Sequence, residues 1–307
     1  MKSQTLSIVI PTIGRNVLDQ KIESVLNQSE LPDEIVVWDN SGNCIAQKKS
    51  NFSKNDKIRW CSSKEQIPII DSWNAAVRCT SGEFVYILGD DDLLIPGFVK
   101  KIKEELAQSV QLIHVENIFI DENGNTINEN RNHLSSSRIS KNEFLEIFSK
   151  SNDINIFLSS LIFPRQVFEE IGGFKDIVSN GLAMDVLFNI ELLDKCESIS
   201  IFHEPMWKYR TFVSDWCGAV KNPSQIPIIA NAYLEYRNYV SRYFSGELKN
   251  IFPLFCKRRI TSQIIGVCYP TNAWKTFLLI FKHEFSLKEK ISMLRDVFYM
   301  FRHYRKK

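Results

Sequence analysis

Residues 83–92 read EFVYILGDDD. The apolar run at residues 84–88 is typical of a strand buried on both faces, and it leads directly into one glycine and three aspartates. In open α/β sheets, ligands bind beyond the carboxyl ends of the strands. These ten residues therefore predict a buried parallel strand and, at its end, the edge of the sheet at which a ligand binds.

The chain before residue 83 alternates between strand and helix patterns. Runs of β-branched and aromatic residues predict strands at residues 6–10, 34–38 and 58–60. Apolar residues at helical spacing predict helices at residues 18–26 and 70–79. This order predicts a doubly wound α/β sheet with right-handed crossovers.

The chain after residue 92 continues this alternation and then changes character. The elements expected there are helices at 97–109 and 185–193, strands at 112–120 and 199–202, and a surface loop or lid at 128–140. From about residue 225 the pattern becomes one of aromatic and basic helices. We expect Pro253 and Pro270 to break these helices, because proline lacks the amide proton that a helix interior requires.

With 307 residues, of which 44% are hydrophobic and 24% are charged, the chain can bury a full core. Its apolar runs, such as residues 277–281, fall far short of the roughly 18 residues that cross a bilayer. Residues 2–11 contain too short an apolar run for a secretory signal. We therefore expect a cytoplasmic protein.

Charge is distributed unevenly along the chain. Residues 241–307 carry 14 Lys/Arg and 4 Asp/Glu, a net charge of +10 that leaves −8 for residues 1–240. Basic residues interleaved with aromatic ones suit a helix that lies on an anionic membrane surface. A helical cap with solvated lysines is the alternative. Nucleic acid is not an expected partner, because residues 1–240 would repel phosphate backbones and no nucleic-acid-binding motif is present.

The three adjacent carboxylates at residues 90–92 repel one another, and a bound divalent cation would remove that cost. Asp39 follows the strand at 34–38 in the same way, so two acidic strand ends are expected to meet at one edge of the sheet. The alternatives for the triplet are a solvated loop, or a helix cap formed by Asp92.

Taken together, these motifs resemble the successive signatures of the family 2 glycosyltransferases. The segments that carry the resemblance are residues 7–12 (SIVIPT), 34–41 (EIVVWDNS), 73–76 (WNAA), 81–92 (SGEFVYILGDDD), 159–163 with 172–174, and 209–210. They extend over roughly residues 5–215, and their order and spacing agree with the family. The resemblance implies the GT-A fold, which has a Rossmann-like, mostly parallel central sheet flanked by helices. Here a C-terminal helical extension would follow it.

The resemblance also divides the chain into three parts. Residues 1–98 would form the half of the GT-A domain that binds the nucleotide sugar, and residues 99–222 the half that binds the acceptor. Residues 223–307 would form the basic, aromatic helical region. The chain departs from the family pattern at Ile13, Gly89 and Met184.

For the donor, the resemblance implies a nucleotide pocket lined by Pro11 and Thr12, and a hydrogen bond between the base and Asp39. Asp39 could instead be a turn-forming residue. Asp90 would lie near the ribose or the metal. Arg210 would bind a phosphate through its planar guanidinium, unless it forms a structural ion pair. The resemblance leaves the nucleobase open and favours a UDP-sugar.

For the cofactor, the resemblance implies a divalent metal, Mn²⁺ or Mg²⁺, bound by a DXD-like motif. Asp91 occupies the position of the family's metal ligand, and Asp92 is expected beside it at the metal. Asp92 could instead contact the donor sugar or cap the local structure. The metal would bridge the diphosphate oxygens and neutralise charge on the leaving nucleoside diphosphate.

Inverting transfer needs a general base, because the acceptor hydroxyl must lose its proton as it attacks. The resemblance places this base at Asp185, which opens a helix after the glycine turn at 172–174. Asp176 is the second candidate for the base. An acid in the first turn of a helix, without a catalytic role, is the alternative for Asp185.

These motifs predict a metal-dependent inverting glycosyltransferase that moves a sugar from a nucleotide-diphosphate donor to a hydroxyl of a glycan or polyprenyl-diphosphate-linked glycan. The resemblance implies bacterial surface polysaccharide or lipopolysaccharide synthesis at the inner face of the inner membrane. A degenerate GT-A protein that only binds nucleotide sugar, or acts as a scaffold, is the alternative. Nucleotidyl transfer to a sugar phosphate is disfavoured, because residues 11–15 (PTIGR) form no glycine-rich phosphate loop.

Overall fold

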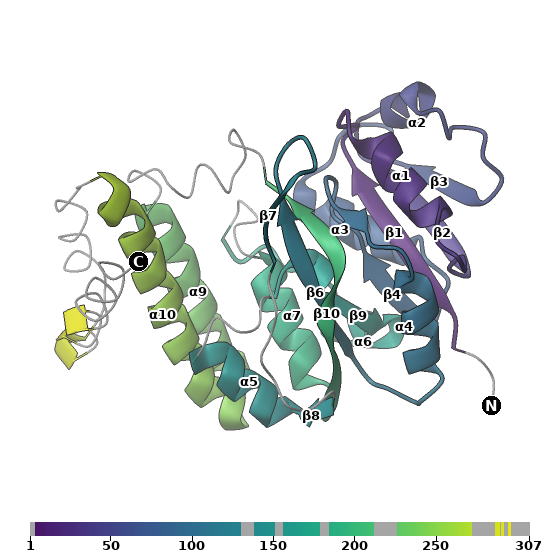
Figure 1. The fold of residues 1–307 in the computed structure, drawn as a ribbon. Coiled ribbons are helices and arrows are strands. Elements are labelled where there is room, and N and C mark those ends of the chain that lie inside the picture. Colours follow the sequence, from purple (N-terminus) through teal and green to yellow (C-terminus); the bar gives the residue numbers. More distant parts are fainter. Residues whose placement is uncertain are drawn as a thin grey trace. The chain divides into compact units, whose positions relative to one another are not determined.

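The computed structural model of the protein describes residues 4–129, 138–150, 156–178, 184–211, 226–271, 286–288, 290–291 and 294–295. The chain forms two compact units. The first unit contains residues 1–144, 152–176 and 184–210, and the second contains residues 145–151, 177–183 and 211–307. Figure 1 shows the sheet of the first unit and the helix pair of the second.

The strands of the first unit form a single sheet. They are β1 (Leu6–Thr12), β2 (Glu34–Asp39), β3 (Ile58–Ser62), β4 (Phe84–Ile87), β5 (Leu93–Leu94), β6 (Ile113–Ile120), β7 (Thr126–Glu129), β8 (Arg138–Ser140), β9 (Leu161–Pro164) and β10 (Ser198–Arg210). Among the described residues the sheet has ten strands, and its main path runs β3-β2-β1-β4-β9-β6-β10-β5. β7 pairs with β6, and β8 pairs with β10. The predicted α/β class is confirmed.

The two halves of the sheet differ in strand direction. β1 to β4 pair in parallel, as the sequence predicted. β9 is antiparallel to both of its neighbours, β4 and β6, and β5 is antiparallel to β10. An apolar run indicates burial but carries no information about strand direction, so the sequence did not predict this mixed half.

The stretch at residues 128–140, predicted as a surface loop or lid, begins and ends in strands. β7 ends at Glu129 and pairs with β6, and β8 begins at Arg138 and pairs with β10. Residues 130–137 lie outside the described residues. The polar composition of this stretch hid the strands, because pairing with a neighbouring strand outweighs the weak intrinsic preferences of the residues.

Helices cover both faces of the sheet (Figure 1). One layer contains α1 (Leu18–Leu26) and α4 (Phe98–Leu106), which share a buried cluster with alternate residues of β1 such as Ile8 and Ile10. The other layer contains α3 (Ile69–Arg78), α6 (Arg165–Ile171) and α7 (Met184–Asp194). The first unit also contains the short α2 (Ile45–Lys49), whereas α5 (Lys141–Lys150) begins in the first unit and ends in the second. Each fully buried apolar side chain contributes about 1.5–3 kcal/mol, so these layers fix the strands firmly.

The sheet topology brings the ends of distant strands to one edge. β1, β2 and β4 are parallel, so Thr12, Asp39 and the segment after Ile87 lie at the same edge. β9 reverses direction between β4 and β6, which makes β6 and β10 parallel to β4. The end of β10, at Arg210, therefore reaches the same edge from the far side of the sheet.

The second unit contains two helices that pack side by side, α9 (Ile226–Tyr243) and α10 (Gly246–Thr271) (Figure 1). The prediction that Pro253 breaks this region is wrong, because α10 continues through Pro253. Phe252 and Phe255 are buried on either side of the proline, and their burial offsets its cost of about 3 kcal/mol in a helix interior. Pro270 stands one residue before the end of α10. Of the helices in the described part of the chain, none has the length and apolarity to span a bilayer.

Candidate active site

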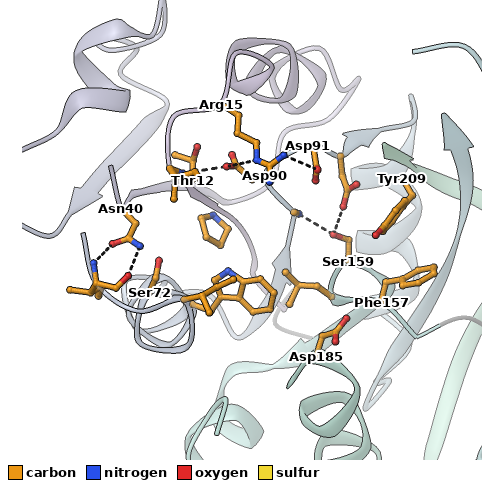
Figure 2. A pocket seen from close by; sticks show the side chains of 18 of the residues that line it. Thr12, Arg15, Asn40, Ser72, Asp90, Asp91, Phe157, Ser159, Asp185 and Tyr209 are labelled. Atoms are coloured by element: carbon orange, nitrogen blue, oxygen red, sulfur yellow. Dashed lines mark hydrogen bonds and ion pairs between the residues drawn. The ribbon is translucent and has the colours of Figure 1, made fainter. Parts of the chain in front are cut away.

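A cavity of about 430 Å³ lies at the carboxyl edge of the sheet (Figure 2). Its walls come from the ends of β1, β2 and β4, from residues 66–73, from residues 157–159, from the start of α7 and from β10. The predicted site residues that line it are Pro11, Thr12, Asp90, Asp91, Asp92 and Asp185. The structure thus brings together residues that are up to 174 positions apart in the chain, while Asp39 and Arg210 are not among the lining residues.

One end of the cavity is shaped by Asn40, which follows β2. Its side-chain amide donates to the carbonyl of Ile67 at 2.9 Å and accepts from the amide of Ile67 at 2.9 Å. These paired bonds hold residues 66–67 against the cavity (Figure 2). Asn40 thereby gives a fixed wall to the pocket that Pro11 and Thr12 border from β1.

Asp39 is fully buried and forms the turn that leads into α2. One carboxylate oxygen accepts from the amide of Ser41 at 2.9 Å and from the Ser41 hydroxyl, and the other accepts from the amide of Gln47 at 2.8 Å. This is the turn-forming role that the sequence left as an alternative. A contact between Asp39 and the base stays a prediction, and it would require the carboxylate to exchange one of these bonds.

Asp90 and Asp91 face a cation at the mouth of the cavity. Arg15 places its guanidinium 3.6 Å from one carboxylate oxygen of each (Figure 2). Asp90 also accepts a hydrogen bond of 3.3 Å from the amide of Ile13. The side chains of Asp90 and Asp91 are 18% and 23% exposed, so both carboxylates can reach a ligand in the cavity.

A second cation lies beneath the triplet and is fully buried. Lys21 of α1 has 0% of its side chain exposed, and its ammonium group is 3.6 Å from Oδ1 of Asp90. Burial lowers the pKa of Lys21 below its usual range, and the carboxylates of Asp90, Asp92 and Asp91 oppose that shift. The strand end is therefore a cluster of three acids and two bases.

Asp92 differs from the other two aspartates because it turns into the protein. Its carboxylate accepts from the Ser159 hydroxyl at 2.9 Å and from the amide of Arg210 at 3.4 Å, and the residue is 4% exposed. Burial raises the pKa of Asp92 to about 7, and the charge of Asp91 adds to this rise. The structure shows Asp92 as a structural residue, and metal binding by Asp92 stays a prediction that would require these bonds to break.

Gly89 makes room for the inward position of Asp92. A Cβ at residue 89 would lie 2.6 Å from Oδ2 of Asp92, which is closer than real side chains approach. The amide of Gly89 donates to the Ser159 hydroxyl at 3.0 Å, so one hydroxyl joins the glycine to the aspartate. The departure from the family at Gly89 thus has a local physical reason.

Arg210 is buried and ties three segments together. Its guanidinium donates to the carbonyl of Asp91 at 3.2 Å, to the carbonyl of Glu122 at 2.8 Å and to the side chain of Gln20 at 3.2 Å. These bonds fix the backbone of the triplet against α1. A phosphate contact by Arg210 stays a prediction, since the side chain would first have to leave these partners.

Asp185 stands on the opposite side of the cavity from Arg15, Asp90 and Asp91 (Figure 2). It lies in the first turn of α7, where its carboxylate accepts from the amide of Val186 at 2.9 Å. Residue Asp176, the second candidate for the base, does not line this cavity. The geometry therefore favours Asp185 over Asp176 as the carboxylate that meets an acceptor.

Aromatic packing fixes the helix that carries Asp185. Phe188 of α7 stacks on Phe174 with ring centroids 3.9 Å apart. The side chain of Asn74 on α3 bonds both backbone groups of Phe174, at 2.8 Å and 2.9 Å. Asn189 donates to the carbonyl of Phe157 at 3.0 Å, which connects α7 to the cavity wall.

The family model for Glycosyl transferase family 2 matches residues 7–172, which is more than half of the chain. The chain belongs to glycosyl transferase family 2. It is thus a glycosyltransferase, and the matched segment contains the ends of β1, β2 and β4 that form the cavity.

Relatives of this transferase agree with that assignment. It is 27% identical over 297 residues to the GalNAc(5)-diNAcBac-PP-undecaprenol beta-1,3-glucosyltransferase of Campylobacter jejuni, covering 94% of this chain and 89% of the relative. Its structure matches the crystal structure of S. aureus TarS 1-349 with a TM-score of 0.63 at 14% identity, covering 94% of this chain and 80% of that one. The complex of that TarS fragment with UDP-GlcNAc matches with a TM-score of 0.58 at 15% identity, covering 97% and 92%. The predicted GT-A fold is confirmed.

The carboxylates that line the cavity suit a metal ion only when a bound substrate supplies further oxygen ligands. Among the residues that the structure describes, no group of three His, Cys, Asp or Glu side chains is arranged to hold a metal ion. Asp91 and Asp90 do reach the cavity, and Mg²⁺ is commonly held by one or two carboxylates together with substrate phosphates. These residues therefore fit a divalent cation that Asp91 shares with a diphosphate.

The sequence did not assign several residues that the structure places at the site. These are Arg15, Lys21, Asn40, Phe157, Ser159 and Tyr209. The burial of Lys21 could have been predicted, because this residue falls in the apolar stripe of α1 between Leu18 and Val25. A lysine at a core position of an amphipathic helix indicates a buried acidic partner. Ser159 gave no such signal, because its partners are 67 and 70 positions away.

Proposed function

We propose that this transferase moves a sugar from a UDP-sugar to a hydroxyl of a lipid-linked glycan, with inversion, in bacterial surface polysaccharide synthesis. The observation that carries the proposal is one cavity with Asp90, Asp91 and Arg15 on one side and Asp185 on the other (Figure 2). The relative from Campylobacter jejuni is named for an undecaprenol-linked acceptor, and the TarS fragment has been crystallised with UDP-GlcNAc and with UDP. These names support the choice of donor and acceptor.

The donor would lie along the strand ends. Pro11, Thr12 and Asn40 would border the nucleoside, and the diphosphate would extend toward Arg15. Arg15 is suited to this task because its planar guanidinium can exchange a carboxylate for a phosphate with the same geometry. Asp39 would act chiefly by holding the turn before α2, next to Asn40.

Asp91 would hold a divalent cation, Mn²⁺ or Mg²⁺, whose chemistry when bound is to neutralise the charge of the leaving nucleoside diphosphate. Asp90 would lie beside it, kept in place by the amide of Ile13 and by Lys21. Asp92 would stay inside the protein and fix the backbone of the triplet through Ser159.

Asp185 would be the general base. It faces the cavity from the side opposite the acidic strand end, which is where an acceptor hydroxyl must stand to attack the anomeric carbon from behind. Phe157 lines the cavity between Asp185 and Tyr209, with its ring centroid 4.9 Å from that of Tyr209, and the two rings would exclude water from the acceptor (Figure 2). The proton of the acceptor hydroxyl would pass to the carboxylate of Asp185 as the new glycosidic bond forms.

The acceptor chemistry gives the second unit a role. An acceptor on a polyprenyl diphosphate is held at a membrane, and the basic residues 257–259 of α10 would attract anionic lipid. The aromatic and basic residues predicted to add to this contact at 274–281 and 298–307 lie outside the described residues. These features support our proposal that the transferase works at the inner face of the bacterial inner membrane.

A transfer assay with Asp91→Asn tests the metal and the reaction together. Wild-type protein should transfer sugar from one UDP-sugar to an undecaprenyl-diphosphate-linked glycan with added Mn²⁺ or Mg²⁺, and EDTA should abolish the transfer. Asp91→Asn should reduce kcat/KM about 100-fold or more, because it removes the ligand that shares the cation with the diphosphate. Asp56→Asn, an exposed aspartate away from the cavity, is the matched control.

Three results would contradict the proposal. Full activity in EDTA would exclude a role for a metal in the reaction. Wild-type activity of Asp91→Asn would exclude a role for Asp91 in the site. Stabilisation by UDP without any transfer to a glycan would favour the alternative of a binding protein, since a ligand at 100 times its Kd adds about 2.7 kcal/mol of stability.

A further inference from the structure

Lys21 occupies an unusual place for a lysine. It lies on the buried face of α1 with 0% of its side chain exposed, between the core residues Leu18 and Ile22. Its Nζ is 3.6 Å from Oδ1 of Asp90, and neither atom has a hydrogen-bond partner among the described residues. A buried ammonium group without hydrogen bonds is costly, so the carboxylates beside it must be what keeps it there.

The two cations of the strand end differ in their freedom to move. Arg15 is 36% exposed and borders the cavity, so its guanidinium can leave Asp90 and Asp91 when a ligand enters. Lys21 is enclosed between α1 and the sheet and has no such route. A ligand can replace Arg15 but not Lys21.

The position of Lys21 is also fixed by its helix. Ser24 accepts from the amide of Leu94 at 3.1 Å, and Gln28 donates to the carbonyl of Ile95 at 3.1 Å. Gln20, next to Lys21, accepts from Arg210 at 3.2 Å. These bonds join α1 and the residues after it to the segment that follows the triplet and to the end of β10, so the helix cannot withdraw the lysine.

We propose that Lys21 is a permanent internal counter-ion of the strand-end carboxylates and that it sets the affinity of the site for a divalent cation. The inference rests on the proposed metal site at Asp91. Because Lys21 already balances part of the negative charge, the protein alone binds the cation weakly. The diphosphate of the donor supplies the missing negative charge, so cation and nucleotide bind together.

Mn²⁺ binding measured by the EPR signal of the free ion tests this without any turnover. Wild-type protein should bind Mn²⁺ weakly alone and much more tightly with UDP. Lys21→Met keeps the length of the side chain and removes the charge, so Mn²⁺ alone should bind on the order of tenfold more tightly, and UDP should add less. Lys103→Met is the matched control, because it removes the same charge from a pair with Glu30 and Asp33, which are not cavity residues.

A second pair of variants covers the case in which Lys21→Met does not fold. Asp90→Asn should weaken Mn²⁺ binding, and Lys21→Met/Asp90→Asn, which removes both charges of the ion pair, should recover about tenfold of that affinity. Equal affinities in these two variants, or in wild type and Lys21→Met, would overturn the role of Lys21 while leaving the metal in place. No Mn²⁺ binding by wild type with or without UDP would overturn the metal site itself, and with it the role of Lys21.

Discussion

The two walls of the cavity differ in the chemistry of their side chains. The wall at the strand ends is ionic: Arg15 lies within ion-pair distance of both Asp90 and Asp91, and Lys21 pairs with Asp90 from beneath. In the described part of the chain, the opposite wall presents the carboxylate of Asp185, with the ring of Phe157 nearby (Figure 2).

The difference between the walls matches two separate chemical tasks. A wall of paired charges can bind a polyanion by exchanging partners, so its acids and bases need not change their protonation. A carboxylate that faces the acceptor from the other side can instead accept the proton of its hydroxyl. Phe157 lies on the side of Asp185, and Arg15 belongs to the ionic wall (Figure 2).

The largest expected effect on kcat comes from the wall that carries Asp185. Asp185→Asn should lower kcat about 10³-fold, because the acceptor hydroxyl loses its base, and should leave the affinity for UDP unchanged. Steady-state kinetics and a UDP titration of the same preparation measure the two quantities. Asp176→Asn, on the same part of the chain but away from the cavity, should keep its kcat. A kcat of Asp185→Asn within tenfold of wild type would show that the two walls do not divide the tasks in this way.

The burial of Asp92 should make the stability of the protein depend on pH. The pKa of Asp92 is raised to about 7, and its unfolded value is near 3.9, so between these pH values the native state binds more protons than the unfolded state. The free energy of unfolding should therefore fall as pH rises through this window. Asp92→Asn has no charge to bury. Between pH 4 and pH 8 its free energy of unfolding should therefore rise by up to about 4 kcal/mol relative to that of wild type.

Urea denaturation of both proteins in EDTA, at several pH values, measures this difference. The asparagine can still accept from the amide of Arg210 through its oxygen, and its NH2 group can donate to the Ser159 hydroxyl, so both contacts can persist without the charge. Glu83→Asn, at an exposed position, should give a pH profile parallel to that of wild type. Parallel profiles for Asp92→Asn as well would mean that Asp92 titrates as an ordinary surface aspartate.

The smallest expected effect lies at the mouth of the ionic wall. Arg15→Gln should raise the KM for the donor about tenfold and change kcat little, because the guanidinium binds the diphosphate without taking part in the proton transfer. Lys100→Gln, an exposed cation on α4, controls for net charge. The tenfold change should shrink at high salt, which screens exposed charges. A lower kcat with an unchanged KM would instead assign Arg15 to the transition state.

Local patterns predicted most of the first half of the fold. The runs at 6–10 and 84–88 became buried parallel strands because apolarity and strand length are properties of short segments. The direction of β9, the strands inside 128–140 and the passage of α10 through Pro253 depend on partners far along the chain. No pattern within a short window contains that information.

The site was predictable in its composition but not in its orientations. Local patterns placed Asp90 and Asp91 at the ligand-binding edge, because strand ends can be read from a sequence, and the family resemblance added Asp185 to the same cavity. Which way Asp92 and Arg210 point is decided by Ser159 and Glu122, whose distances along the chain hide the contact. Burial and hydrogen bonding, more than residue type, separate the ligand-facing acids from the structural one.

The hydroxyl of Ser159 limits how this enzyme can be recombined with its relatives. It accepts from Gly89 and donates to Asp92, so the edge proposed to bind the donor takes its shape from a residue in the part of the chain proposed to bind the acceptor. A chimera joined near residue 98 would unite two halves that look separable in sequence. It would keep a working donor site only if the incoming half brings a hydroxyl to the position of Ser159. An exchange of substrate specificity between such enzymes therefore has to transfer Gly89, Asp92 and Ser159 together.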